Sequence, residues 1–249
     1  MAGSLMTSDA HAEHGPFTYG GSELELFAEA VNWKAYWMRH VRQFIRGDVL
    51  EVGAGIGANT QMLCSERVRR WLCLEPDPRQ AARLRTAVST QPDAQRIEIV
   101  IGGLGDLQPD ARFDTILYVD VLEHIANDRE ELTRAEGHLR PDGALIVLAP
   151  AHPRLFGRFD AALGHHRRYT RRGLAAIMPP SLTQLELMHL DSCGLLALLG
   201  NRILLRQSVP SRSQVLIWDR VMVPASRWLD TLTGHRVGKS VLGIWQKAG

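Results

Sequence analysis

The sequence predicts an α/β protein whose core is a doubly wound, mostly parallel sheet. Apolar strand-like runs alternate with helix-like segments between about residues 48 and 150, a glycine-rich turn follows the first strand, and acidic residues end later ones. Such alternation implies helices on both faces of the sheet and a ligand crevice at the carboxyl ends of its strands. With 249 residues, 45% of them hydrophobic, the chain is long enough for one sizeable domain.

Each element of this core has a local signal in the sequence. Apolar runs rich in β-branched residues indicate strands, and longer amphipathic segments indicate helices. Pro141-Asp142-Gly143 marks a turn before the fifth strand. The expected strands are residues 48–53, 70–75, 96–101, 113–119, 143–149, 184–191 and 241–246, and the expected helices are residues 59–67, 77–90 and 127–138, with one or two more between 22 and 45.

The glycine-rich turn lies in the stretch from Asp48 to Thr60, DVLEVGAGIGANT. Glycines at alternate positions let backbone N–H groups approach a ligand closely. Glu51 precedes the turn, and Glu75 ends the second strand, where it can accept hydrogen bonds from both hydroxyls of a ribose. The carboxylates argue against a phosphate, and G-x-G-x-G differs from the G-x-G-x-x-G of a dinucleotide site. The turn is therefore predicted to bind a nucleoside cofactor that carries a positive charge.

These motifs resemble those of the class I S-adenosylmethionine (SAM)-dependent methyltransferases that act on small molecules. The matching elements, in the family's order, are E-x-G-x-G-x-G, the acidic residue in L-C-L-E-P-D, G-D-L after the third strand, and the acidic end of the strand in F-D-T-I-L-Y-V-D-V-L-E-H-I. The resemblance covers about residues 48–150. It implies a Rossmann-like, seven-stranded sheet with an antiparallel last strand, SAM as the cofactor and S-adenosyl-L-homocysteine (SAH) as the product.

The resemblance also implies which residues hold SAM. Asp106 is expected at the adenine amine, with a plain turn as the alternative, and Asp120 beside the methionine part. Tyr19 and Trp37 belong to a segment that covers the site in the family, although packing against the sheet is the preferred interpretation for Trp37 taken singly. The predicted cofactor-binding residues are Glu51, Gly53, Ala54, Gly55, Gly57, Thr60, Glu75, Pro76, Gly105, Asp106, Leu107, Asp120, Val121, Tyr19 and Trp37.

The acceptor side is expected in the loops after the fourth and fifth strands. His124 has a pKa range suited to taking a proton from an acceptor, whereas many relatives keep this E-H pair as architecture. The segment 164–170, GHHRRYT, resembles an acceptor-side signature of the family, and its cations suit an acidic or phosphate-bearing acceptor. A solvated basic loop is the alternative. The predicted catalytic residues are His124, His166, Arg168 and Tyr169.

Composition excludes several other classes. A net charge of +2 gives no signature of nucleic-acid binding. The three cysteines form no C-x-x-C pair, so the sequence predicts no disulfide framework and a cytoplasmic location. The histidines after the fifth strand lack a helical pairing or a carboxylate partner, so no metal site is predicted. No signal peptide or membrane-spanning segment is expected.

The predicted organisation is a flexible N-terminus, residues 1–21, followed by a single domain, residues 22–249. Within the domain, residues 22–46 are expected to form an N-terminal helical lid, and residues 195–238 a helical insertion before the last strand. The insertion is rich in Leu, Trp and Arg, and its apolar residues at helical spacing need a partner surface. In order of preference, the insertion is expected to cover the active site, to form a homodimer interface, or to contact a membrane surface.

The predicted function is therefore methyl transfer from SAM to an oxygen or nitrogen of a small molecule, in secondary-metabolite or glycan biosynthesis. Two other interpretations stay open. A nicotinamide-dependent oxidoreductase is disfavoured by the glycine spacing, by Glu51 and by the absence of a Tyr-x-x-x-Lys pair. A non-catalytic SAM-binding partner protein would keep the cofactor residues but lack an acceptor pocket.

Overall fold

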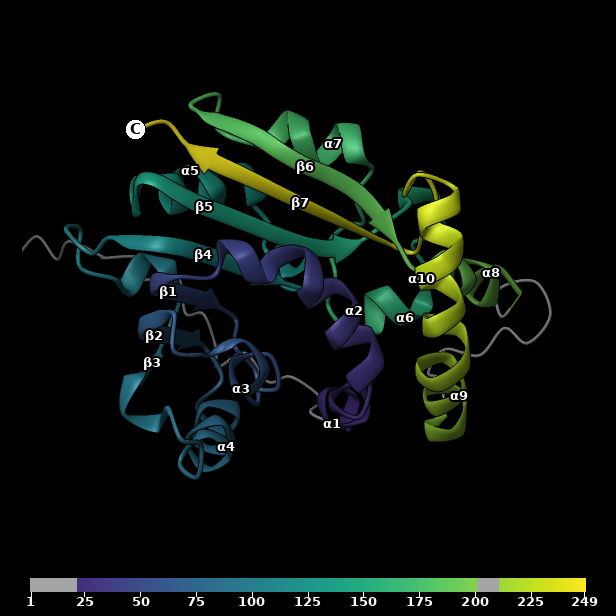
Figure 1. Cartoon of the computed structure of the whole chain (residues 1–249), viewed down its shortest axis with the longest axis horizontal. Coiled ribbons are helices and arrows are strands. Elements are labelled where there is room, and N and C mark those ends of the chain that lie inside the picture. Colours follow the sequence, from purple (N-terminus) through teal and green to yellow (C-terminus); the bar gives the residue numbers. More distant parts are fainter. Residues whose placement is uncertain (1–21, 201–210) are drawn as a thin grey trace, which may run out of the picture.

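The computed structural model describes residues 22–200 and 211–249, and it contains a seven-stranded mixed sheet with helices on both faces (Figure 1). The predicted position of Tyr19 lies outside the described residues. The strands are β1 (Gly47–Val52), β2 (Val68–Glu75), β3 (Ile97–Ile101), β4 (Phe113–Val119), β5 (Leu139–Pro150), β6 (Leu182–Leu190) and β7 (Ser240–Lys247).

The strand order is β3-β2-β1-β4-β5-β7-β6. Only β7 runs antiparallel to its neighbours, β5 and β6, whereas the other adjacent pairs are parallel. The chain moves outward from β1 to β3 and then returns to β4 on the other side of β1. In such sheets the ligand crevice opens where the strand order reverses. The predicted doubly wound sheet with an antiparallel last strand is thus confirmed.

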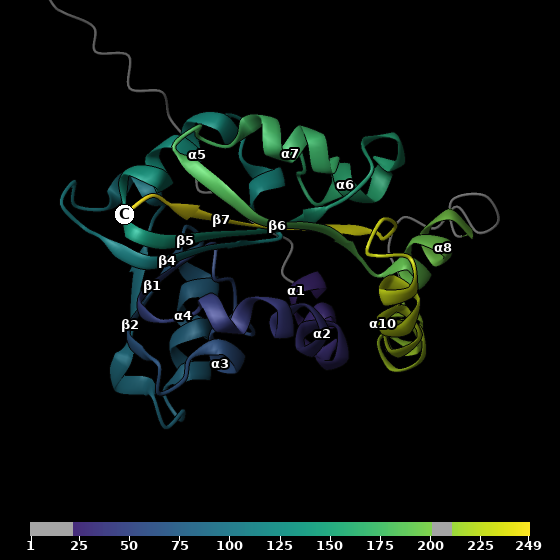
Figure 2. The ribbon, with the colours of Figure 1, turned by 45° about the horizontal axis from the view of Figure 1, so that its top comes forward.

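Each face of the sheet is covered by its own set of helices (Figure 2). α5 and α7 lie on one face and α2, α3 and α4 on the other. Successive strand residues supply the two cores: Val49 packs in the cluster that contains Trp37 of α2, and Leu50 in the cluster that contains Leu132 of α5. The helices are α1 (Ser22–Ala28), α2 (Val31–Val41), α3 (Thr60–Leu63), α4 (Pro78–Val88), α5 (Asp128–Gly137), α6 (Arg158–Ala162), α7 (Arg171–Ile177), α8 (Ser192–Gly200), α9 (Arg212–Ile217) and α10 (Val223–Leu232).

Two elements differ from their predicted bounds by more than two residues. The helix expected at 59–67 ends at Leu63, because Cys64 is extended and a turn, in which the Val68 N–H donates to the Ser65 carbonyl, leads directly into β2. The fifth strand begins at Leu139 rather than at 143. The expected turn is instead a register shift within β5, where Asp142 has a φ of 61°.

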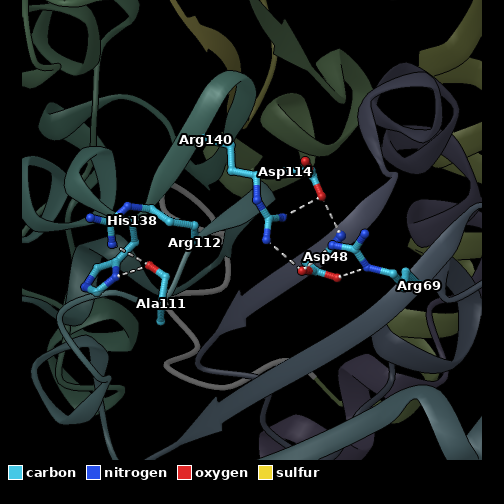
Figure 3. Close-up of polar contacts among 7 residues, drawn as sticks. All are labelled: Asp48, Arg69, Ala111, Arg112, Asp114, His138 and Arg140. Atoms are coloured by element: carbon cyan, nitrogen blue, oxygen red, sulfur yellow. Dashed lines mark hydrogen bonds and ion pairs between the residues drawn. The ribbon is translucent and has the colours of Figure 1, made fainter.

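The starts of four strands are joined by a polar network at the edge of the sheet opposite the crevice (Figure 3). Asp48 of β1 accepts hydrogen bonds from Arg69 of β2 and Arg140 of β5. Arg140 also donates to Asp114 of β4, and Asp114 in turn accepts the Asp48 N–H. These contacts fix the relative register of β1, β2, β4 and β5.

The helices between β6 and β7 form a layer beside the N-terminal helices, α1 and α2 (Figure 1). α9 and α10 are joined by a π-helical turn at Trp218–Met222. α10 packs against α8 and α2, and α9 packs against α1. Their outer face exposes large apolar side chains, Ile217, Val221, Trp228 and Leu232. In the part of the chain that the structure describes, no helix combines the length and apolar character needed to cross a bilayer.

Candidate cofactor and acceptor site

The glycine turn connects β1 to α3 with a backbone that L-residues rarely adopt. Gly53, Gly55 and Gly57 have φ values of 68°, 58° and 81°. Gly53 N–H and Ala54 N–H both donate to the carbonyl of Leu74, at 2.8 and 3.0 Å, so the turn is fastened to the end of β2. A Cβ atom at Gly55 would be in ordinary van der Waals contact with the Leu24 methyl groups, at 3.8 Å, so the backbone there is not crowded.

Glu51 does not face the cavity, contrary to the prediction that it would face a cationic ligand. Its Oε2 accepts hydrogen bonds from Thr60 Oγ1 at 2.6 Å and from Trp71 Nε1 at 3.0 Å, and the residue is only 2% exposed. Burial raises the pKa of Glu51 to about 7. The hydrogen bond between Glu51 and Thr60 therefore ties the start of α3 to β1, and so holds the glycine turn between them in place.

Glu75 lies at the glycine turn, as expected for the acidic end of β2. One carboxylate oxygen accepts the Gly55 N–H at 2.7 Å and the other accepts the Asp77 N–H at 3.0 Å. Burial raises the pKa of Glu75. After the next strand, β3, a short helical turn ends at Asp106, which accepts the N–H of Gly103 at 2.8 Å. This is the turn interpretation considered for this residue.

A cavity of about 310 Å³ opens beside the glycine turn and extends away from it under α1, α2 and the C-terminal helices. One end is lined by the turn itself. The other end is lined largely by aromatic and apolar side chains. The lining includes Gly53, Ala54, Gly55, Ile56, Leu24, Phe27, Trp33, Trp37, Phe159, Leu163, Leu198 and Trp218.

Asp120 also lines the cavity. It follows β4, has a φ of 53°, and is solvent-accessible from the cavity. The surrounding protein raises its pKa, and the positive charges of Lys239, His165 and Lys34 act in the opposite direction. Lys239 Nζ lies 3.5 Å from the centre of the Trp218 ring. Burial lowers the pKa of Lys34 to about 8.

Four polar residues form the wall of the cavity beyond Asp120. Asp160 Oδ1 accepts a hydrogen bond from Arg168 Nε at 2.7 Å and lies 3.1 Å from His165 Nδ1. His165 Nε2 lies 4.0 Å from Glu123 Oε1. Burial and the charge of Asp120 raise the pKa of Glu123 well above its usual range, whereas burial lowers that of His124 to about 4.

Comparison with known proteins identifies the class of this domain. Residues 50–145 match the family model described as a methyltransferase domain. Residues 50–145 of this chain therefore form a methyltransferase domain. The curated relatives include a demethylmenaquinone methyltransferase of Tropheryma whipplei, 31% identical over 52% of this chain and 53% of the relative. They also include a tRNA U34 carboxymethyltransferase of Shewanella denitrificans, 22% identical over 53% of this chain and 40% of the relative. The chain thus spans about half the length, or less, of these relatives.

Solved structures share the fold over almost the whole length of this chain. The N-methyltransferase NodS of Bradyrhizobium japonicum in complex with SAH has a TM-score of 0.55 at 14% identity, over 96% of this chain and 94% of NodS. The [4+2]-cyclase SpnF has a TM-score of 0.60 at 15% identity, over 92% and 95%. At these identities the likeness establishes the Rossmann-like methyltransferase fold alone. The same fold also occurs in SpnF, an enzyme named for a different reaction.

This cavity brings together some of the predicted site residues but not others. Asp120, His124 and Arg168 line it, as do Trp37 and the turn residues Gly53, Ala54 and Gly55. His166 lies outside it and is exposed, with its N–H donating to the Glu123 carbonyl. Tyr169 is buried, and its hydroxyl donates to Asp128 and Leu122, so it braces a loop rather than facing an acceptor. The other predicted residues that the structure describes and that lie outside the lining are Glu51, Gly57, Thr60, Glu75, Pro76, Gly105, Asp106, Leu107 and Val121.

The sequence did not predict several residues that line the cavity. Lys34, Phe159, Asp160 and Trp218 line the acceptor end, together with Lys239 just before β7. Asp160 caps the start of α6 by accepting the Gly157 N–H at 2.8 Å, so the G-x-x-D spacing was a local signal that could have located it. Trp218 and Lys239 carry no such signal, because only the tertiary fold brings these distant segments to the cavity.

Proposed function

We propose that this protein transfers the methyl group of SAM to a small molecule bound in the aromatic end of the cavity. The proposal depends chiefly on one observation: the glycine turn, a cluster of aromatic side chains and Asp120 all line the same cavity. A group transfer needs adjoining sites for donor and acceptor, and most of the catalytic advantage of such an enzyme comes from holding the two in line.

The residues at the turn fit an adenosyl cofactor. The open backbone face at Gly55 leaves room that a side chain would fill, and Glu75 lies within hydrogen-bonding reach of the same glycine. When bound, SAM supplies a methyl group on a positively charged sulfonium. Glu75 would then accept from the ribose hydroxyls, and Asp120 would place a negative charge near the sulfonium. Glu51 supports the turn instead of contacting the cofactor.

The acceptor end favours a flat, largely apolar molecule. Phe27, Trp33, Phe159 and Trp218 are among its walls, and aromatic rings suit a planar ligand. Lys239 adds a cation that would stabilise an ionised hydroxyl or carboxyl group. Oxygen methylation of an acidic aromatic compound fits these walls better than methylation of a polynucleotide. The name of the T. whipplei relative supports a small-molecule acceptor, whereas the tRNA carboxymethyltransferases make RNA the alternative to test.

Calorimetry with SAH tests the cofactor half of the proposal. We expect the wild-type protein to bind SAH and Glu75→Ala to bind it at least about tenfold more weakly, because hydrogen bonds to a charged group contribute about 1.5–3 kcal/mol each. Glu98→Ala removes an exposed carboxylate from the adjacent strand β3 and should leave binding unchanged. Binding of NAD in place of SAH, or undiminished binding by Glu75→Ala, would overturn the proposal.

Transfer of a labelled methyl group from SAM tests the acceptor half. The panel should contain hydroxylated aromatic acids, quinols and tRNA. We expect an aromatic compound to be methylated, and Trp218→Ala to lower its turnover while SAH affinity stays within about twofold. Methylation of tRNA alone would contradict the small-molecule acceptor. Tight SAH binding with no methylated product in any class would favour a SAM-binding protein without transferase activity.

A further inference from the structure

Three side chains with metal-ligating atoms converge on the wall of the acceptor chamber. Glu123 and His124 lie on a short turn after β4, and His165 comes from the loop after α6. One ligand atom from each lies within 4.8 Å of the others. The rings of His124 and His165 meet edge to face, with their centres 4.6 Å apart.

Glu123 is the member of this group that most needs a partner. It is 1% exposed, and its Oε2 has no hydrogen-bond partner within the described ranges 22–200 and 211–249. Its other oxygen is 4.0 Å from His165 Nε2, which is too far for a hydrogen bond. Buried carboxylates in proteins are normally paired, hydrogen-bonded or bound to a metal ion. The Oε2 atom of this buried carboxylate therefore lacks a group that would compensate it.

His165 is already held as a metal-binding histidine would be. Its Nδ1 is 3.1 Å from Asp160 Oδ1, so that a proton on Nδ1 leaves the lone pair of Nε2 on the side of Glu123. Asp160 is fixed in turn by Arg168 at 2.7 Å and by the Gly157 N–H at 2.8 Å. Metal-ligating histidines usually donate their second ring N–H to a carboxylate in this way, which sets the tautomer and the ring orientation.

We propose that Glu123, His124 and His165 bind a divalent transition-metal ion of the Zn²⁺ type in the wall of the acceptor chamber. Two imidazoles and one carboxylate suit Zn²⁺ and its neighbours in the first transition row, whereas Mg²⁺ prefers oxygen ligands. Ligand bonds of about 2.0–2.2 Å place the ligand atoms of a tetrahedral ion about 3.4 Å apart. The three side chains would therefore move inward by about an ångström on binding.

Such an ion would also balance the charge at this end of the cavity. Asp120, Glu123 and Asp160 are three carboxylates in one region, and Asp160 is paired with Arg168. Three protein ligands leave a coordination position open toward the cavity, as in catalytic zinc sites. An acceptor hydroxyl bound there would lose its proton more readily. This catalytic role rests on the proposed methyl transfer, but binding of the ion does not.

Metal binding can be measured without SAM or an acceptor. The full-length protein is freed of metal with a chelator and titrated with Co²⁺, followed by visible absorption, and with Zn²⁺, followed by calorimetry. We expect one ion per chain, with Mg²⁺ in large excess failing to displace it. At a hundredfold excess over its dissociation constant, Zn²⁺ should raise the melting temperature by about 5 °C. The absence of a stoichiometric Co²⁺ or Zn²⁺ site would overturn the proposal.

Single substitutions locate the ion. Glu123→Gln and His165→Gln should each weaken Zn²⁺ binding at least a hundredfold, and Asp160→Asn should weaken it about 10–100-fold because it releases the ring of His165. His166→Ala is the matched control, since His166 is the next residue along the chain but is exposed and outside the cavity. It should bind Zn²⁺ as the wild type does.

SAH binding by the same preparations separates a lost metal site from a lost fold. The Glu123→Gln and His165→Gln proteins should bind SAH with wild-type affinity while losing Zn²⁺. Equal Zn²⁺ affinity in these variants and the wild type, or an equal loss in His166→Ala, would show that the ion binds elsewhere and would refute the assignment. A wild type that binds Zn²⁺ but not SAH would support the metal site and contradict the proposed methyl transfer.

Discussion

At the scale of single residues, the glycines of the turn have different neighbours although their backbones are alike. Gly55 lines the cavity, and an added Cβ would be in ordinary van der Waals contact with Leu24, 3.8 Å away. Gly57 faces the core, where an added Cβ would lie 2.2 Å from Leu84 Cδ1. A methyl group at the first position would thus intrude on the cofactor, and a methyl group at the second would intrude on the packing of α4.

Alanine substitutions at these two glycines should separate binding from stability. Gly55→Ala should lower the free energy of unfolding by about 1–2 kcal/mol, from backbone strain at positive φ, and weaken SAH binding at least tenfold. Gly57→Ala adds overpacking against Leu84 to the same strain, so we expect a loss of about 2–5 kcal/mol. Urea denaturation and calorimetry measure the two effects. Wild-type SAH affinity in Gly55→Ala would show that the cofactor does not approach this backbone.

At the scale of secondary-structure elements, the two edges of the sheet have separate tasks. The carboxyl ends of β1, β2 and β4 carry the glycine turn, Glu75 and Asp120, whereas the starts of these strands and of β5 carry the ion-pair network of Figure 3. Arg140 is central to that network because it pairs with both Asp48 and Asp114, at 2.9 and 2.8 Å. A change there should alter stability without altering the site.

Arg140→Met should destabilise the protein in a pH-dependent way. Its pairs are partly exposed, so we expect a loss of about 1–2 kcal/mol at neutral pH and unchanged SAH binding. Arg69 and Arg140 lower the pKa of Asp48 below its ordinary 3.8. A lowered folded-state pKa stabilises the protein above the unfolded value and ceases to do so as the pH falls through the folded one. The difference between wild type and variant in urea denaturation should therefore shrink below about pH 4.

A second arginine provides the control for this experiment. Arg134 pairs with Glu130 one turn earlier on α5, and both side chains are about half exposed. Arg134→Met should cause no measurable change in stability, because exposed ion pairs contribute little. If Arg140→Met were no more destabilising than Arg134→Met, or if its effect were the same at pH 3.5 and pH 7, the network would not hold the strand starts together.

At the scale of the whole molecule, the sequence predicts what local patterns encode and misses what distant segments build together. The seven strands, the glycine turn, and the positions of Glu75 and Asp120 all follow from periodicity and motif order. The acceptor chamber does not, because Trp218 and Lys239 reach it from the far end of the chain. Glu51 and Tyr169 show the converse limit: their residue types suit a site, but a neighbouring donor or acceptor makes each of them structural.

The C-terminal helices are attached to the rest of the protein through buried carboxylates. Asp219 lies in the π-helical turn between α9 and α10, and it accepts the Trp33 N–H at 2.8 Å and the Asn32 N–H at 3.2 Å. These are the first N–H groups of α2, and the residue before that helix, Ala30, supplies no side-chain cap. A residue 187 positions along the chain therefore caps α2. Because Trp33 and Trp37 of α2 line the cavity, the shape of the site depends on this contact.

Asp219→Ala should consequently affect both stability and the cofactor site. Loss of a helix cap and of buried hydrogen bonds predicts a decrease of about 2–4 kcal/mol in the free energy of unfolding. Amide hydrogen exchange at Asn32 and Trp33 should accelerate, and SAH should bind more weakly because α2 moves more freely. Arg212→Ala is the matched control, since its exposed ion pair with Glu29 also joins the C-terminal helices to the N-terminal ones, and it should change none of these quantities. If exchange in α2 were as slow in Asp219→Ala as in Arg212→Ala, the C-terminal helices would cover the cavity without setting its shape.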